Sequence, residues 1–270
     1  MPELPEVETT IRGLEPVLLG QRIALAEPRR PDLRRPIPPD LRQRMTGAMV
    51  TGLGRRAKYG LIDTDRRDTL IFHLGMSGRW RLDPEEIGIH DHLVIETGIG
   101  RRLALNDPRR FGSLDLVRTE ALAGFAPFAA LGPEPLGPDF TADYLARAFA
   151  DRTGPVKSLL LDQRVVAGLG NIYVCEALHQ ARIAPGTSGR RIRAARLERL
   201  VSAIREIIAA AIEAGGSSLR DYAQPDGQLG YFFKSWRAYG REGEACGCGG
   251  RIRRRVDSGR STFYCPRCQR

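Results

Sequence analysis

The spacing of apolar residues is helical near the start of the chain. The recurring positions, three or four residues apart, are Thr10, Ile11, Leu14, Val17 and Leu18. This spacing predicts an amphipathic helix over 9–20, which Gly20 closes. Pro16 either kinks this helix or marks an earlier end.

From residue 22 to residue 118 the pattern changes to short apolar runs separated by Gly, Pro and Asp. The runs predict strands at 23–26, 49–52, 59–63, 69–73, 92–96, 102–106 and 113–117. Many short strands at this spacing are typical of a β-sandwich or a β-barrel. The stretch 28–40 is rich in Pro and Arg, so we expect a loop there.

Residues 131–139 break the pattern, because three prolines and two glycines sustain neither a helix nor a central strand. Helical spacing follows at 141–150, 156–163, 171–181 and 194–214. A Gly-Gly pair ends the last helix, and the tail has the pattern of a basic hairpin. We therefore predict a β-rich domain over 1–130, a linker over 131–139, a helical domain over 140–233 and a hairpin over 234–270.

Charge narrows the choice of partner. The chain of 270 residues has a net charge of +10, carried mostly by arginine. The forked guanidinium suits phosphate, so nucleic acid is the first expectation, and an anionic membrane surface the second. A solvated basic face without a partner stays a third possibility. With neither a signal peptide nor a long apolar run in the sequence, we expect a cytoplasmic protein with reduced cysteines.

Four of the five cysteines lie close together near the end of the chain. They form two pairs, Cys246-Gly-Cys248 and Cys265-Pro-Arg-Cys268. Two pairs on facing turns suit one structural zinc ion, held by four thiolates with no open position. Reduced free thiols or a redox pair are the alternatives. Cys175, apart from the others, reads as a small buried residue of a helix.

The first residues carry candidate chemistry. If Met1 is removed, Pro2 offers a secondary amine, and an α-amino group titrates near 7.7–8.0, so part of it is a nucleophile at neutral pH. Glu3 lies beside it as a candidate proton donor or acceptor. The plainer alternative is a helix start, since Pro followed by acidic residues suits a first turn.

Turns elsewhere add candidate contacts. The segment 166–173 places Asn171 after glycines, where it is a natural N-cap and where backbone N–H groups suit a phosphate, with Lys157 upstream. Met76 lies between glycines, and Arg109 precedes Phe111 on a turn; such side chains can wedge into a base stack. The plainer alternatives are an ordinary helical hairpin turn for 166–173 and core residues for Met76 and Phe111.

Two further basic positions stand out in the β-rich half. Lys58 follows two arginines and is able to approach a phosphate or to donate a proton. His90 and His92 flank Asp91 and are candidate phosphate donors or ordinary loop residues.

At this point the sequence resembles the formamidopyrimidine-DNA glycosylase family, bacterial enzymes that remove oxidised purines such as 8-oxoguanine. The resemblance runs nearly end to end. It is carried by the segments Pro2–Glu8, Arg55–Tyr59, His73–Gly78, Asn106–Gly112, Gly168–Tyr173 and Gly259–Cys265. The related endonuclease VIII branch is less similar, because its start usually has Gly in place of Leu4.

The resemblance implies a base-excision repair enzyme with glycosylase and lyase activity. Pro2 would attack the sugar and form a Schiff base, and Glu3 would assist opening of the sugar ring. Lys58 matches the acid of β-elimination, and Arg260 that of δ-elimination. The implied fold is α+β and multidomain: an N-terminal β-sandwich, then a helix–two-turns–helix domain with a C-terminal zinc β-hairpin.

The remaining roles implied by the resemblance concern DNA. The side chains that fill the gap and face the opposite base match Met76, Arg109 and Phe111. Further DNA contacts match His90, Arg152, Lys157 and Asn171. The stretch Ser217–Gly230 matches a mobile loop over the flipped base. We expect a monomer acting on damaged or abasic duplex DNA at the bacterial nucleoid, without a membrane or an obligate protein partner.

One departure from the family pattern concerns the zinc site. The family has two residues between the first two cysteines, whereas here Gly247 alone separates Cys246 from Cys248. Either all four cysteines still bind zinc around a shorter turn, or the site is distorted. Two other hypotheses remain: a zinc-containing nucleic-acid-binding protein without catalysis, and an enzyme of the same fold that prefers oxidised pyrimidines.

Overall fold

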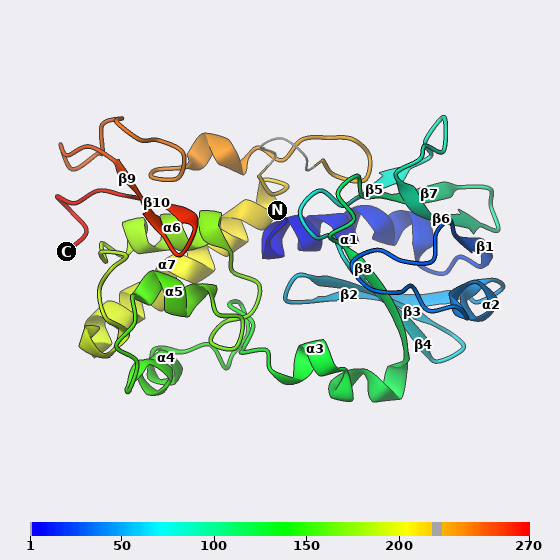
Figure 1. The fold of residues 1–270 in the computed structure, drawn as a ribbon, viewed down its shortest axis with the longest axis horizontal. Coiled ribbons are helices and arrows are strands. Elements are labelled where there is room, and N and C mark those ends of the chain that lie inside the picture. The colour runs from blue at the N-terminus through cyan, green and yellow to red at the C-terminus, as the bar shows by residue number, and fades with distance from the viewer. Residues whose placement is uncertain (1, 218–222) are drawn as a thin grey trace. The chain divides into compact units, whose positions relative to one another are not determined.

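The structure is a computed structural model that describes residues 2–217 and 223–270 (Figure 1). The chain forms two compact units, Met1–Ala129 with Ala214–Phe233 and Ala130–Glu213 with Lys234–Arg270. The segment Ala214–Phe233 therefore belongs to the first unit, although it follows the helical part in the sequence. Of the predicted loop over 217–230, residues 218–222 lie outside the described residues.

Two four-stranded sheets build the first unit. One sheet has the order β1 (Ile23–Pro28), β6 (Asp91–Thr97), β7 (Arg102–Asn106), β5 (Arg79–Leu82). The other has the order β2 (Val50–Arg56), β3 (Tyr59–Thr64), β4 (Asp68–His73), β8 (Ser113–Arg118). All neighbouring strands are antiparallel. Of the two predicted alternatives, the structure is therefore the sandwich.

The helix α1 (Leu4–Leu18) supplies much of the core of this unit. Its apolar residues join those of both sheets in one buried cluster, for example Leu14 with Ile62 and Leu93. Pro16 does not end the helix, because the N–H of Leu19 still bonds the Glu15 carbonyl at 3.0 Å. The sequence pattern did not predict β5 or the short helices α2 (Leu41–Met45), η1 (Thr119–Gly124) and α3 (Ala126–Ala129).

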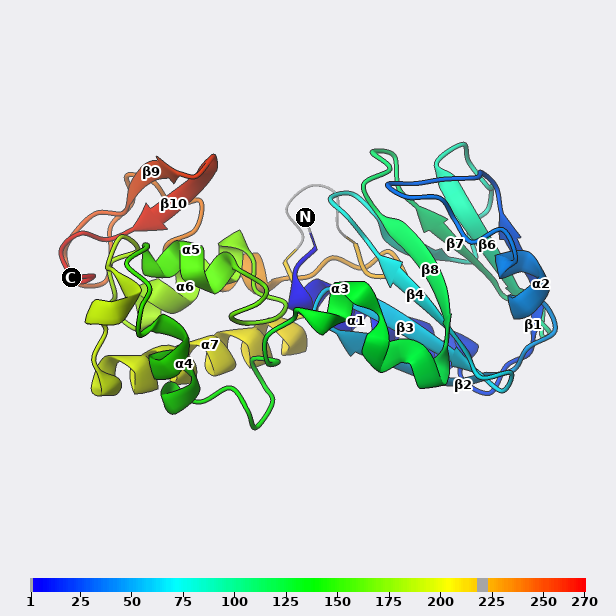
Figure 2. The ribbon, with the colours of Figure 1, turned by 60° about the horizontal axis from the view of Figure 1, so that its bottom comes forward.

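The second unit is helical. Its helices are α4 (Ala142–Phe149), α5 (Val156–Leu161), α6 (Asn171–Gln180), η2 (Gly189–Arg191) and α7 (Ala194–Glu213), with η3 (Phe232–Ser235) just before the C-terminal segment. Helix α6 contacts α5, α7 and the hairpin of β9 (Arg253–Asp257) and β10 (Arg260–Tyr264) (Figure 2). The predicted α+β order of sandwich, helices and hairpin is confirmed. In the described part of the chain, none of the helices is both long and apolar enough to cross a bilayer.

Candidate functional site

Pro2 and Glu3 lie immediately before α1, and both side chains are buried. Glu3 is the N-cap residue, and its side chain accepts a hydrogen bond from the backbone N–H of Glu6. In return, Oε2 of Glu6 accepts the N–H of Glu3 at 2.8 Å. This capping box satisfies donors that the first turn would otherwise leave without partners. The first residues are therefore held in one conformation, with a buried carboxyl group next to Pro2.

Glu6 also reaches a distant part of the same unit. Its Oε1 accepts the N–H of Ser217 at 2.9 Å, and the side chain is 2 % exposed. Gly216, whose φ is +81°, lies against this carboxylate, where an added Cβ would be 3.1 Å from Oε1. One carboxylate thus fixes both the start of the chain and the start of the stretch 217–230. The sequence analysis missed Glu6, although a carboxylate on the apolar side of the first turn was a usable signal.

Lys58 lies in the two-residue turn between β2 and β3. Ala57 in this turn has φ of 52°, and its carbonyl accepts a hydrogen bond from Arg55 at 2.9 Å. Arg55 also bonds the carboxylate of Glu8 in α1 at 3.0 Å. This contact ties the turn that carries Lys58 to the helix that Glu3 caps.

A pocket of about 330 Å³ lies near this turn. Its lining residues are Arg34, Arg35, Tyr59, His73, Phe111 and Ser113. Burial, followed by the positive charges of Lys58, Arg34 and Arg35, lowers the pKa of His73 to about 4. The imidazole is therefore neutral at pH 7, and the concentrated positive charge makes this a site suited to an anion such as phosphate.

The loops that carry Met76, Arg109 and Phe111 are tied together. Ser77 donates to Asp107 at 2.8 Å and accepts the N–H of Arg109 at 3.3 Å. Gly75, at φ +62°, allows this approach, since an added Cβ would lie 2.4 Å from the Phe111 backbone. The Arg109 guanidinium lies 4.9 Å from the centre of the Phe111 ring, and this ring is 44 % exposed. The structure thus brings the three predicted gap-filling residues onto adjoining loops.

The two histidines beside Asp91 differ. His92 is buried, and its Nε2 lies 2.9 Å from the carbonyl oxygen of Asp107, so it donates there and serves the fold. The side chain of His90 is exposed, while its backbone carbonyl accepts the N–H of Asp107 at 2.9 Å. Of the two, only His90 is available to a ligand.

In the second unit, two side chains hold the hairpin residues that follow Arg260. The ammonium of Lys157 donates to the Ser261 carbonyl at 3.1 Å and to the Thr262 hydroxyl at 2.6 Å. The Asn171 amide donates to the same Ser261 carbonyl at 2.9 Å. Lys157 is 2 % exposed, and this burial lowers its pKa, whereas Arg260 is exposed. Buried Lys157 and half-buried Asn171 therefore fix the position of an exposed arginine.

Two of the predicted DNA-contacting side chains, Asn171 and Arg152, bond other residues of this unit. Asn171 is not the N-cap of α6: Gly170 is, and the Asn171 side chain bonds the hairpin instead of its own helix. Arg152 is exposed and lies 3.5 Å from the Asp162 carboxylate, which also bonds Arg164 at 2.9 Å. This pairing holds Arg152 near the surface of the unit.

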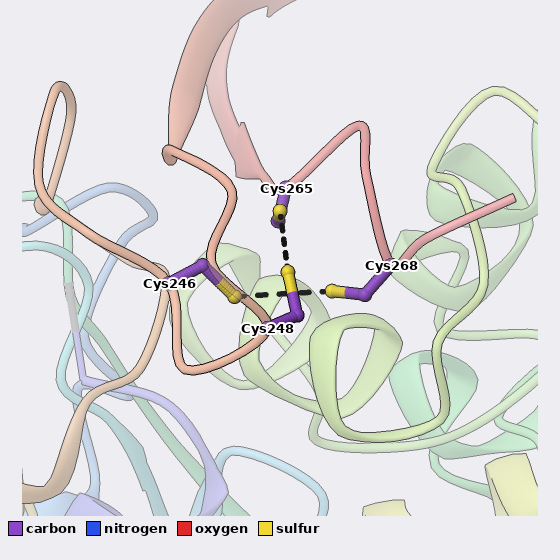
Figure 3. A group of neighbouring side chains, drawn as sticks. All are labelled: Cys246, Cys248, Cys265 and Cys268. Carbon is purple, nitrogen blue, oxygen red and sulfur yellow. Dashed lines mark hydrogen bonds between the residues drawn. The ribbon is translucent and has the colours of Figure 1, made fainter.

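The four cysteines of the tail meet at one point (Figure 3). Their sulfur atoms all lie within 4.8 Å of one another, with Cys246 to Cys268 at 3.8 Å and Cys248 to Cys265 at 3.5 Å. A tetrahedral site with Zn–S bonds of about 2.3 Å needs sulfur separations of roughly 3.8 Å. The donor set fits one structural zinc ion despite the shortened first turn, so the prediction of a four-cysteine site is confirmed.

Backbone groups support this site. The N–H of Gly250 donates to Cys248 and lowers the pKa of this thiol to about 7, which favours the thiolate that zinc binds. An added Cβ on Gly250 would lie 2.8 Å from the Cys265 sulfur, so this position requires glycine.

A second buried carboxylate, Glu176 in α6, was also missed from the sequence. It accepts the N–H groups of Arg237, Ala238 and Tyr239 at 2.7–2.9 Å. These residues lead into the hairpin, so Glu176 anchors the segment before the zinc site. A lone acidic residue in the apolar run of α6 was the signal available in the sequence.

Comparison with known proteins gives family matches over most of the chain. The formamidopyrimidine-DNA glycosylase N-terminal domain matches residues 1–114, and the H2TH domain of the same enzymes matches residues 131–223. A zinc finger found in FPG and IleRS matches residues 248–270.

Curated relatives and solved structures agree with these matches. The chain is 72 % identical to formamidopyrimidine-DNA glycosylase of Rhizorhabdus wittichii and 66 % identical to that of Novosphingobium aromaticivorans, with all of each chain covered. A Lactococcus lactis FPG mutant in complex with Fapy-dG containing DNA is similar with a TM-score of 0.92, at 35 % identity and with both chains fully covered. The Thermus thermophilus FPG protein has a TM-score of 0.88 at 40 % identity, with 99 % of this chain and 98 % of that chain covered.

Proposed function

The chain belongs to the formamidopyrimidine-DNA glycosylase family, and we propose that it excises oxidised purines from duplex DNA through a Schiff base on Pro2. The observation that carries this proposal is the locked start of the chain. Pro2 is joined directly to Glu3, whose buried carboxyl group is fixed by the capping box with Glu6. The capping box accounts for the acid as part of a helix start, but a helix start does not need the secondary amine that Pro2 offers next to this acid.

The chemistry follows from these two groups. Once Met1 is removed, the Pro2 amine attacks the sugar carbon C1′, and the N-glycosidic bond breaks so that the base leaves. Glu3 protonates the ring oxygen, and the ring opens to an iminium. The iminium acidifies the neighbouring C2′ proton, and loss of this proton expels the 3′ phosphate; a second elimination expels the 5′ phosphate.

Lys58 and Arg260 serve the two eliminations in this proposal. Lys58 lies among Arg34, Arg35 and His73, where the positive charge favours a phosphate, and it assists β-elimination. Arg260 is the exposed arginine of the hairpin and assists δ-elimination. Because Lys157 is buried against Ser261 and Thr262, we assign it the support of Arg260, together with Asn171.

DNA is held by residues of both units. Met76 and Phe111 replace the stacking lost when the damaged base leaves the helix, which costs a few kcal/mol, and Arg109 faces the opposite base. His90 and Arg152 are exposed and contact phosphates. The enzyme acts as a monomer on DNA in the bacterial cytoplasm, and one zinc ion holds its hairpin.

Strand-cleavage assays test this function. The substrates are labelled duplexes with 8-oxoguanine opposite cytosine, with an oxidised pyrimidine, and without damage. We expect cleavage mainly at 8-oxoguanine, leaving phosphate at both ends of the gap. The variant Glu3→Gln should lose nearly all base release, whereas Glu15→Gln, an exposed position of the same helix, should keep it. Preferred cleavage at the pyrimidine, or binding without cleavage, would point to the competing hypotheses.

A further inference from the structure

His179, near the end of α6, lies against the zinc site. Its Nε2 is 3.3 Å from the sulfur of Cys246, within the range of a hydrogen bond to sulfur. Among residues 2–217 and 223–270, no other imidazole contacts one of the four sulfur atoms. The family resemblance assigns no role to this position.

The other nitrogen of this ring indicates where its proton lies. Nδ1 is buried and has no hydrogen-bond partner among the described residues. A neutral imidazole has one N–H, and it is placed by the available acceptor. Since Cys246 is the acceptor in reach, the proton belongs on Nε2 and points at the sulfur.

The zinc site needs such donors. Four thiolates outnumber the two positive charges of a zinc ion, so N–H groups directed at the sulfurs stabilise the bound state. Cys248 has such a donor in the backbone N–H of Gly250 at 3.4 Å. The backbone N–H of Cys246 is engaged by the Gly250 carbonyl at 2.9 Å. Inside the shortened turn, the Cys246 sulfur has the backbone N–H of Cys248 nearby. His179 adds a donor to this sulfur from outside the turn.

The same surroundings are positively charged. His179 lines a pocket of about 390 Å³ with three of the cysteines and with Arg182, Arg237 and Arg241. These arginines complement the excess negative charge of the metal site. Among the described residues these arginines donate no hydrogen bond to the sulfurs, so the side-chain donor in this pocket is the imidazole.

We infer that His179 is a positioning residue of the zinc site, which holds the Cys246 thiolate by an N–H···S hydrogen bond and so compensates for the missing residue of the Cys246-Gly-Cys248 turn. Helix α6 then supports the C-terminal segment at three levels. Asn171 at its start bonds Ser261, Glu176 in the middle bonds the segment 237–239, and His179 near its end bonds Cys246.

Metal-binding measurements on the full chain, without DNA, test this inference. Zinc affinity is measured by competition with a chromophoric chelator for the wild type, His179→Phe, His179→Gln and Gln180→Ala. Loss of an outer-shell partner typically weakens metal binding roughly 10- to 100-fold, which is the expected effect of His179→Phe. Gln keeps an N–H donor and should restore most of the affinity. Gln180 bonds Glu206 and not a sulfur, so its variant should match the wild type.

Spectra of the cobalt-substituted protein add a readout that packing alone does not change. Removing the N–H···S bond should shift the thiolate-to-cobalt charge-transfer band of His179→Phe, while His179→Gln and Gln180→Ala keep the wild-type band. Equal zinc affinity and an unchanged band in His179→Phe would overturn the inference. This outcome is independent of strand cleavage, so it leaves the proposed function to its own test.

The wild-type protein offers a check that requires no variant to fold. The chain has four histidines, so the nitrogen shifts of the zinc-loaded, histidine-labelled protein can be resolved by NMR. We expect His179 to carry its proton on Nε2. A proton on Nδ1 with a bare Nε2 would contradict the inference.

Discussion

At the scale of single residues, buried carboxylates determine where the ends of the functional segments lie. Glu6 joins the Glu3 N–H to the Ser217 N–H, and Glu176 collects three successive N–H groups before the zinc hairpin. Each carboxylate accepts charge-assisted hydrogen bonds, which are stronger than neutral ones. Each of these carboxylates therefore fixes the position of a segment far from it in the sequence, namely the start of 217–230 and the segment before the zinc hairpin.

Replacing Glu6 by Gln tests this role. The amide has one acceptor oxygen, so its NH₂ group would face one of the two N–H donors that Glu6 now binds. Leaving a buried donor unsatisfied costs about 1–3 kcal/mol, so we expect a lower urea midpoint and a strong loss of base excision. The matched control is Glu15→Gln on the exposed side of α1. An unchanged midpoint and normal excision in Glu6→Gln would contradict this reading of the first turn.

His73 predicts a pH dependence of stability. Its folded-state pKa, lowered to about 4, lies below the unfolded value of 6.5, so the unfolded chain takes up the proton first. The contribution of neutral His73 to the free energy of unfolding is complete above pH 6.5 and is lost as the pH falls toward 4. The shift corresponds to about 3 kcal/mol, at about 1.4 kcal/mol per pH unit.

The matched variant for this prediction is His73→Asn. Its side-chain oxygen can replace Nδ1 as acceptor of the Gly75 N–H, which His73 binds at 3.0 Å, but it does not titrate. Urea unfolding between pH 7 and pH 4.5 should give a flatter curve for the variant than for the wild type. Parallel curves would show that His73 is not buried in its neutral form.

At the scale of elements, the C-terminal hairpin depends on α6 and on zinc because its own core is small. This core consists of Ala238, Ile252 and Phe263 with the cysteines. Such a segment has too little apolar area to fold alone, so metal binding contributes directly to its folding. The position of Arg260 is then a property of α5, α6 and the metal together.

Lys157→Met isolates the support that α5 gives to this hairpin. Methionine fills similar space but removes two hydrogen bonds to Ser261 and Thr262. We expect a several-fold lower ratio of δ- to β-elimination products, with base release close to wild type. Product ends separated by electrophoresis give this ratio, and Lys234→Met, an exposed lysine, is the control. A product ratio equal to that of the control would show that Lys157 does not support Arg260 in δ-elimination.

At the scale of the whole molecule, the net charge of +10 predicts DNA binding that weakens steeply with salt. Each phosphate contact releases counterions, so the logarithm of the affinity falls linearly with the logarithm of the salt concentration. We expect Arg260→Ala to reduce this slope by about one contact. Arg101→Ala removes a charge that is already paired with Asp83 and should leave the slope unchanged. Equal slopes in both variants would exclude a phosphate contact at Arg260.

Much of this arrangement could be predicted from local sequence patterns. The strands of the sandwich follow from short apolar runs separated by Gly, Pro and Asp, and the four-cysteine site from its spacing. Local patterns did not predict β5 because it has no apolar run: Trp80 is its one fully buried residue, and an arginine lies on either side of it. They also did not reveal that the Asn171 amide bonds Ser261, or that Glu6 bonds Ser217, since these partners are brought together only by the tertiary fold.

The most direct test of the central claim is borohydride trapping on a duplex that contains 8-oxoguanine opposite cytosine. Reduction of the iminium should give a covalent protein–DNA adduct, and digestion followed by mass spectrometry should place the bond on the nitrogen of residue 2. The variant Pro2→Gly, which replaces the secondary amine, should trap far less. Binding of the duplex without any adduct, also with an abasic site, or an adduct on another residue, would contradict the proposed role of Pro2.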